Sequence, residues 1–158
     1  MTEKTFFIIL FCALALAGVI WYIHMTGVNA QEAARITVID FGQALQTVSL
    51  SAPSATVTQE MQSAYGPFVS PDVLALWEAD PTSAPGRLTS SPWPDHIAIT
   101  SLTTDGVGGY HVQGNIIELT SEDVARGTEA GEMPFTATVS LVDGKWMITA
   151  WYTTGMTP

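Results

Sequence analysis

The sequence predicts an α+β domain in which helices are followed by an antiparallel sheet of about four strands. Three observations predict it. Apolar residues between positions 34 and 77 recur at steps of three or four, as on one face of a helix. Between positions 96 and 153 apolar and polar residues alternate, as in half-buried strands. Residues 79–94, between these regions, hold four prolines and one glycine, which break helices and central strands.

An uncharged apolar run of eighteen residues, Phe6–Ile23, precedes the predicted domain. At about 1.5 Å per helical residue the run would extend about 27 Å, close to the thickness of a bilayer core. We therefore expect residues 1–30 to form a transmembrane anchor and residues 31–158 an extracytoplasmic domain. The alternative is a signal peptide cleaved after Ala30, where small residues resemble a cleavage site, and the domain would then be secreted.

The residues that flank the apolar run predict its orientation. Lys4 precedes the run, while Trp21 and Tyr22 lie at its far end, where amphipathic rings favour the headgroup region. Basic residues favour the cytoplasmic side of a membrane. We expect a single-pass protein of the cell membrane with its N-terminus inside and its domain outside.

Composition excludes several classes of function. The chain has 15 acidic and 5 basic side chains, a net charge of −10, so its surface repels phosphate backbones and we expect no nucleic-acid partner. Its only cysteine, Cys12, lies in the apolar run, so the domain has no disulfide or thiolate metal site. His24, His96 and His111 match no metal-ligand spacing, and we expect neither metal nor cofactor.

Three helices are predicted before the proline-rich loop. The first spans residues 34–50 and turns one apolar face inward: Val38, Phe41, Leu45 and Val48. The second carries Val57, Met61 and Ala64/Tyr65 and ends at Gly66–Pro67. In the third, Ser70 is the expected N-cap and Pro71 the first helical residue; its expected buried side chains are Leu74, Leu76 and Trp77.

Four strands are predicted after the loop, at residues 96–103, 110–120, 135–142 and 145–153. Asp143–Gly144 is a typical two-residue turn and joins the last two as a hairpin. Strict alternation gives the hairpin one buried face: Phe135, Ala137, Val139, Leu141, Trp146, Ile148, Ala150 and Tyr152. Met147 and Trp151 then fall on the reverse face, where they indicate a partly covered second face, a pocket or a subunit contact, and we take them as candidate partner-binding residues. Residues 118–133 are expected to form a solvated connection.

Helices followed by a meandering sheet resemble the cystatin-like or NTF2-like cone, in which a curved sheet wraps a helix and leaves a cavity at its wide end. Two segments, Val69–Trp77 and Ala84–Asp95, also resemble uncharacterised membrane-anchored bacterial proteins. The first resemblance implies ligand-binding residues inside the cone, for which the candidates are Trp93, His111 and Tyr152.

NTF2-like enzymes place an Asp, His or Tyr inside the cone. The corresponding candidates are Asp40, Tyr65, His111 and Tyr152, but none belongs to a catalytic motif of that family. The sequence therefore assigns no catalytic residue and favours a non-enzymatic role.

The segment Arg87–His96 is the densest group of polar and aromatic residues, and it has two interpretations. Asp95 and His96 could form an acid–base pair beside Trp93. Alternatively, Arg87 pairs with Asp95 and holds the loop, while Trp93 covers the edge of the sheet. We expect the second arrangement, because adjacent strand residues point to opposite faces and would separate Asp95 from His96.

Three functional hypotheses follow. The first is a tethered, non-enzymatic module that binds a protein partner or itself, as an accessory of a cell-envelope or secretion machine. The second is a small-ligand-binding protein or slow NTF2-like enzyme that uses the cone cavity. The third is a structural spacer.

Overall fold

The chain divides into two compact units, residues 1–33 and residues 34–158. The computed structural model describes residues 29–153, so the predicted membrane run Phe6–Ile23 lies outside the described residues. Of the first unit it describes only residues 29–33, which are helical. Within residues 29–153 no helix is long and apolar enough to cross a bilayer. The second unit carries the predicted α+β fold.

The helices of the second unit follow the predicted order. Residues 34–44 are helical and lead into the 3₁₀ turn η1 (Leu45–Thr47), followed by α2 (Ser54–Ala64) and α3 (Pro71–Ala79). The expected inward face of the first helix is confirmed, since all four of its side chains are 0% exposed: Val38, Phe41, Leu45 and Val48. The predicted end of the second helix is also confirmed, with Tyr65 as its C-cap.

The third helix begins as predicted, but one of its expected core residues was wrong. The side chain of Ser70 accepts a hydrogen bond from the Val73 amide and caps α3. Leu76 is 67% exposed, whereas Val73 and Trp77 are buried. Val73 and Trp77 are four residues apart and share a helix face, and Leu76 is turned about 100° from Trp77. A second 3₁₀ turn, η2 (Pro81–Ser83), follows α3.

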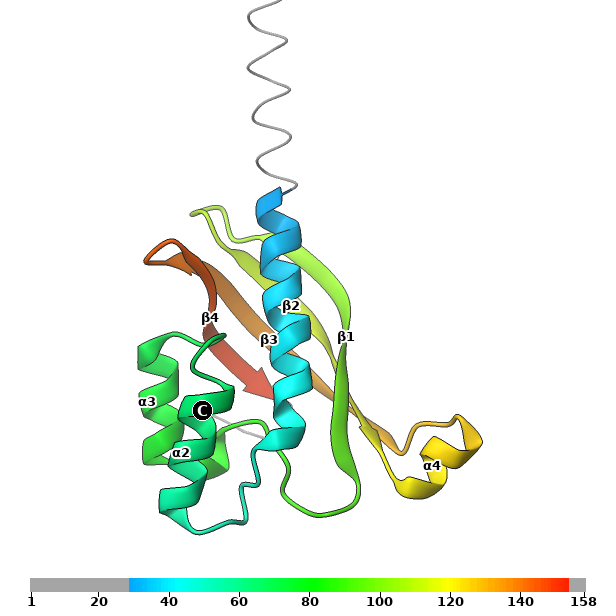
Figure 1. Cartoon of the computed structure of the whole chain (residues 1–158). Helices are drawn as coiled ribbons and strands as arrows, with labels where there is room; N and C mark the ends of the chain where they lie inside the picture. The colour runs from blue at the N-terminus through cyan, green and yellow to red at the C-terminus, as the bar shows by residue number, and fades with distance from the viewer. Residues whose placement is uncertain (1–28, 154–158) are drawn as a thin grey trace, which may run out of the picture. The chain divides into compact units, whose positions relative to one another are not determined.

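The sheet has four antiparallel strands in the order β1-β2-β3-β4. Their bounds are β1 (Trp93–Thr104), β2 (Tyr110–Leu119), β3 (Gly131–Val142) and β4 (Lys145–Thr153). In Figure 1 helix 34–44 runs across one face of this curved sheet, and α2 and α3 lie beside the helix near β4. The Asp143–Gly144 hairpin is confirmed, because both residues have positive φ angles, 48° and 80°.

The expected connection at residues 118–133 is only partly a loop. It contains α4 (Ser121–Arg126), which projects from the end of the sheet in Figure 1. Thr120 and Asp123 form a capping box, in which each side chain bonds the backbone amide of the other residue. The spacing of Thr120 and Asp123 was the signal for this helix, and its short polar sequence hid it.

Aromatic rings fill the space between helix 34–44 and the sheet. The centroid of the Phe41 ring lies 5.1 Å from that of Tyr65, 6.0 Å from that of Trp77 and 5.2 Å from that of Trp151. Trp151 also stacks on Phe135, with ring centroids 4.3 Å apart. Aromatic side chains therefore fill the interior of the predicted cone where helix 34–44 packs against the sheet.

Helix 34–44 lies close against the sheet at a glycine. A Cβ atom on Gly42 would lie 2.8 Å from the Ile97 side chain on β1, closer than such contacts allow. Glycine at this position lets the helix backbone rest against the strand, and the rings on either side can then reach the sheet.

The expected inward face of β4 was wrong beyond Ile148. A register shift between Thr138 and Val139 leaves Thr149 without a partner in the pairing of β3 with β4. This bulge reverses the alternation that follows it. Trp151 is therefore in the core at 8% exposure, and Tyr152 points outward at 58%. Leu141, expected to be buried, is 56% exposed near the tip of the hairpin.

Candidate functional site

The three predicted ligand-binding residues do not meet in a cavity. Tyr152 and His111 alternate with buried neighbours, so both point away from the helices. Trp93 pairs with Leu119 at one end of β2, eight residues from His111 along that strand. Eight residues of extended strand correspond to about 26 Å. The structure therefore separates Trp93 from His111 and places none of the three in the filled interior.

The predicted partner surface on the reverse face of the hairpin is not formed. Met147 is half-buried, and Trp151 is packed between Phe41 and Phe135. The Trp151 indole nitrogen is buried and has no hydrogen-bond partner among the described residues. Trp151 consequently contributes to the core rather than to a contact surface.

Asp95 and His96 were expected to diverge, and this was wrong. Their side chains are in contact, with His96 Nδ1 2.8 Å from Asp95 Oδ2. The cause is a register shift between Pro94 and His96, which takes Asp95 out of the pairing with β2. Gln46 also donates a hydrogen bond to the Asp95 carbonyl, with an N···O distance of 2.9 Å. The contact orients the imidazole, as carboxylates do in acid–base pairs.

Arg87 holds its loop through the main chain instead of through Asp95. The Arg87 amide donates to the Val48 carbonyl, and the Leu50 amide donates to the Arg87 carbonyl, each over 3.0 Å. The Asp95 carboxylate is in contact with the His96 side chain. The loop is thus fixed, as expected, but by a short parallel bridge between Ser49 and Arg87.

An apolar pocket lies where this loop crosses the end of the sheet. Its volume is about 50 Å³. Each strand contributes one residue near an end, and these are Pro94, Ile116, Met133 and Thr153. The other walls come from Leu50, Thr82, Leu88 and the segment 84–86. The pocket therefore lies at one end of the sheet, and its lining includes none of the residues predicted to bind a ligand.

The pocket wall formed by residues 84–86 is held in place by the side chains of Tyr65 and Leu50. The buried Tyr65 hydroxyl donates to the Pro85 carbonyl over 2.7 Å, and burial raises the pKa of this phenol well above its ordinary value. A Cβ atom on Gly86 would lie 2.9 Å from the Tyr65 hydroxyl oxygen and 3.1 Å from Leu50. The loop backbone is seated directly on these two side chains, which fixes the shape of the pocket.

Carboxylates lie next to the pocket on the sheet side and on the loop side. Glu118 pairs with Pro94 in the sheet. On the loop side, Asp80 accepts hydrogen bonds from the amide and the hydroxyl of Thr82, over 3.2 and 2.6 Å. Two carboxylates therefore lie next to residues that line the pocket, whereas Glu132, which precedes Met133 and contacts Asn115, points to the opposite face of the sheet.

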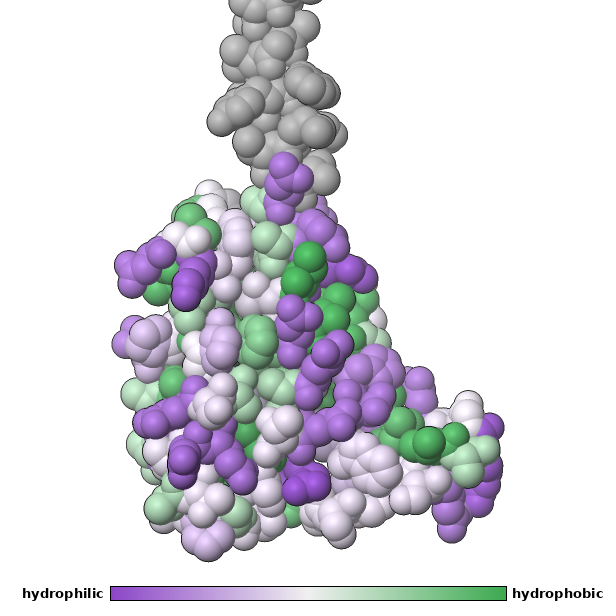
Figure 2. Space-filling view, viewed as in Figure 1, coloured by the Kyte–Doolittle hydropathy of each residue, from purple (hydrophilic) through white to green (hydrophobic). Residues whose placement is uncertain are grey.

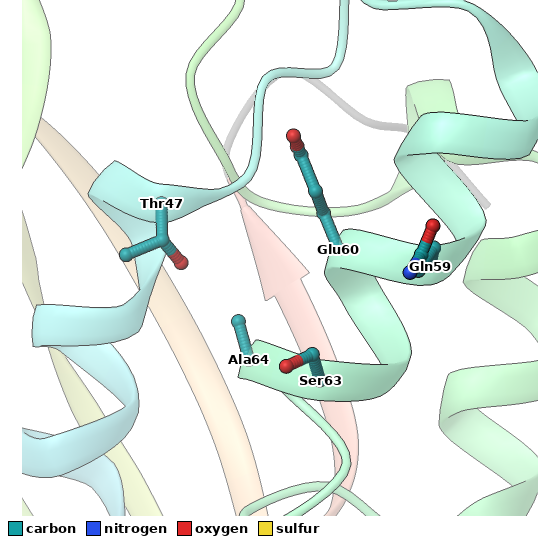
Figure 3. Close-up of a pocket in the computed structure, with 5 residues that line it drawn as sticks. All are labelled: Thr47, Gln59, Glu60, Ser63 and Ala64. Atoms are coloured by element: carbon teal, nitrogen blue, oxygen red, sulfur yellow. The ribbon is translucent and has the colours of Figure 1, made fainter.

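A second, polar pocket lies between η1 and α2. Figure 3 shows the residues that line it: Thr47, Gln59, Glu60, Ser63 and Ala64. It is wider, about 260 Å³, and open to solvent. The Glu60 carboxylate accepts a hydrogen bond from the Ser49 amide over 3.0 Å, which links α2 to the segment after η1. Glu60 therefore has a structural partner already.

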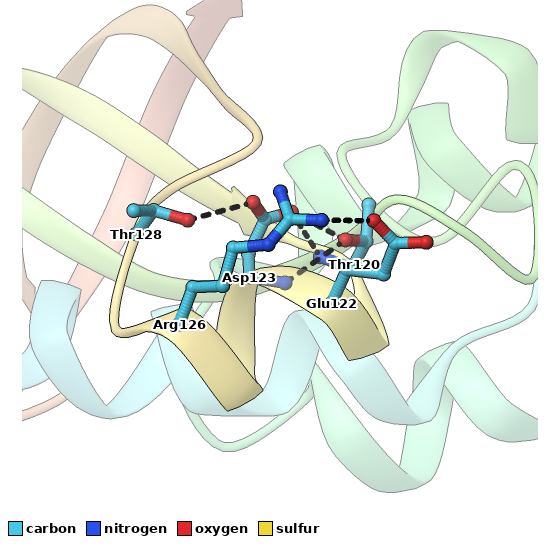
Figure 4. Close-up of polar contacts among 5 residues, drawn as sticks. All are labelled: Thr120, Glu122, Asp123, Arg126 and Thr128. Carbon is cyan, nitrogen blue, oxygen red and sulfur yellow. Dashed lines mark hydrogen bonds and ion pairs between the residues drawn. The ribbon is translucent and has the colours of Figure 1, made fainter.

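The polar side chains of the α4 arm, residues 118–132, are also largely engaged with one another (Figure 4). Asp123 bonds Thr120, and the Thr128 hydroxyl donates to it over 2.9 Å. These hydrogen bonds lower the pKa of the Asp123 carboxyl. Arg126 and Glu122 form an ion pair of 2.6 Å. Val124 stays 61% exposed, and Figure 2 shows hydrophobic atoms on this projecting part.

Sequence reasoning missed the residues of the apolar pocket. The available signal was Leu88, the single large aliphatic residue among residues 79–94, which proves to be 60% exposed. Within residues 29–153 no group of three or more His, Cys, Asp or Glu side chains could hold a metal ion. Comparison with known proteins gives no match, whether with family models, curated proteins or solved structures.

Proposed function

We propose that this chain is a membrane-tethered, non-enzymatic module that binds a protein partner outside the cytoplasm. Two features of the sequence support the tether and its direction: the apolar run Phe6–Ile23, and Lys4 before it. Such a module suits an accessory role in a cell-envelope or secretion machine. The observation that carries the binding role is the apolar pocket at the end of the sheet.

The size of the pocket favours a protein partner over a small molecule. Sites that enclose a drug-sized ligand usually measure about 300–1,000 Å³, whereas this pocket measures about 50 Å³. It can hold part of a side chain but not a whole metabolite. The exposed Leu88 extends the apolar surface beyond the pocket, as the contact area of a larger partner requires.

Site-specific photo-crosslinking in cells tests the binding role. A photoreactive residue at Leu88 is expected to give a discrete crosslinked product, while the same residue at Leu76 on α3 gives none. The two positions are matched controls, since both are exposed leucines, at 60% and 67%. Equal labelling at both positions, or no product at either, would contradict partner binding through the pocket; the second result favours a spacer.

A cysteine-labelling experiment tests the location. Because Cys12 is the only native cysteine and lies in the apolar run, a Cys12→Ala, Ser90→Cys chain carries one reactive thiol on the exposed loop. A membrane-impermeant maleimide should label this thiol in intact cells, and the chain should sediment with membranes. Labelling only after cell lysis would place the domain inside and overturn the proposal.

The contact between Asp95 and His96 favours a second candidate, small-ligand binding or slow acid–base chemistry. An imidazole held by a carboxylate through Nδ1 can act as a base through its other nitrogen. Both side chains are solvent-exposed, at 34% and 51%, where water competes with a substrate. A ligand that shifts tryptophan fluorescence in the native chain and not in His96→Ala would support this candidate.

A further inference from the structure

We infer that the apolar pocket receives one branched aliphatic side chain from a basic segment of the partner. The inference rests on the proposed binding function and adds the chemistry of the partner. Three properties of the pocket support it: its volume, its lining and the charge around it.

The volume limits the group that can enter. A protein cavity of about 150 Å³ binds benzene, and this pocket measures about 50 Å³. An aromatic ring is therefore too large, while the terminal methyl groups of leucine, isoleucine or valine can enter. The walls cannot readily widen, because hydrogen bonds hold the loop at the Pro85 carbonyl and at the backbone of Arg87.

The lining favours an aliphatic group over a polar one. Ala84 and Ile116 are each 1% exposed, and Leu88 stands at the outer edge with 60% exposure. Thr153, 6% exposed, is the buried polar residue of the wall. An inserted aliphatic side chain would be removed from water on most sides, and that burial favours binding.

The charge near the pocket indicates which residues should flank the inserted side chain of the partner. Asp80 and Glu118 lie beside lining residues, and together they outnumber Arg87, the basic residue of the adjoining loop. The whole chain carries a net charge of −10. Lysine or arginine on either side of the inserted side chain would be attracted to this surface, and acidic residues would be repelled.

Short peptides test the inference directly. The full chain in neutral detergent micelles is titrated with the peptide amides KKLKK, KKAKK, KKFKK and EELEE, and the NMR methyl signals of Ile116 and Met133 are followed. KKLKK should shift both signals in a saturable manner. KKAKK should bind at least about tenfold more weakly, because it lacks the buried methyl groups. KKFKK should also be weaker, and EELEE should produce no shift.

Matched variants of the chain separate the two parts of the inference. Leu88→Ser should lower the affinity of the chain for KKLKK at least about threefold, while Leu76→Ser should leave this affinity unchanged. Glu118→Gln should lower the affinity for KKLKK about twofold and make this affinity less dependent on salt, whereas Asp143→Asn at the distant hairpin turn should have no effect.

Two kinds of result would overturn the inference. Equal binding of KKLKK and KKAKK, or no shift of the Ile116 and Met133 methyl signals, would exclude insertion of an aliphatic side chain into the pocket. Equal binding of KKLKK and EELEE would exclude the basic segment. Neither result would alter the crosslinking or thiol-labelling outcome, so failure of this inference is distinguishable from failure of the proposed function.

Discussion

The space beneath helix 34–44 and the pocket at the end of the sheet are bounded by the same four strands but differ in what fills them. Beneath the helix, the Trp151 ring packs against the rings of both Phe41 and Phe135. At the strand ends, the backbone of residues 84–86 takes the place of large side chains and leaves about 50 Å³ open. We expect the first region to supply stability, and we propose that the second is a preformed surface for binding.

The largest expected effect tests the filled region at the bulge in β4. Replacing Trp151 by alanine should lower the free energy of unfolding by about 3–5 kcal/mol, because a buried aromatic side chain is lost. Replacing its neighbour Tyr152 should cost about 0.5 kcal/mol or less, because that ring is mostly in solvent. Urea denaturation of the full chain measures both.

These two variants distinguish the bulged strand from a regular one. Unbroken alternation would put Tyr152 inside and Trp151 outside, and the two costs would then be exchanged. A larger loss for Tyr152→Ala than for Trp151→Ala would therefore show that β4 has no bulge and that the interior is packed differently.

A smaller effect is expected where the two regions meet, at Tyr65. Tyr65→Phe keeps the ring against Phe41 but removes the hydroxyl that binds the Pro85 carbonyl. The loss should be about 1–2 kcal/mol, the cost of a buried hydrogen bond whose acceptor is left unpaired. The loop should also become more mobile, which increased amide hydrogen exchange at Gly86 and Arg87 would report.

The dependence on pH gives Tyr65 a specific signature. Its folded-state pKa is raised by burial, whereas a tyrosine in the unfolded chain ionises near 10. The unfolded state therefore loses its proton first, and stability falls as pH rises above about 10. This alkaline loss should be smaller in Tyr65→Phe. Parallel curves for the native chain and the variant between pH 8 and 11 would show that Tyr65 is not buried as described.

The sequence predicted those parts of the fold that depend on local patterns. The inward face of helix 34–44, the Ser70 cap and the Asp143–Gly144 turn each follow from residues close together in the chain. Alternation failed at the bulges at Asp95 and at Thr149, because an extra residue in one strand is determined by its pairing with the next strand. That is why the positions of Trp151 and of the Asp95–His96 pair were both wrong.

The pocket could not be predicted for a related reason. Its lining joins Leu50, Leu88 and residues from four strands that are far apart in sequence, and no local pattern indicates that they meet. The sequence did indicate the Arg87–His96 segment as functionally interesting, and one end of the pocket wall lies in it. The anchor and its orientation stay predictions, because Phe6–Ile23 lies outside the described residues.

The contrast between a filled interior and an open pocket can be measured with xenon, which enters apolar cavities in proteins. A crystal of the protein held under xenon pressure should show a xenon atom between Ile116, Met133 and Leu88. No xenon should lie near Phe41. Xenon among the rings of Phe41 and Trp151, with none at the strand ends, would contradict the account.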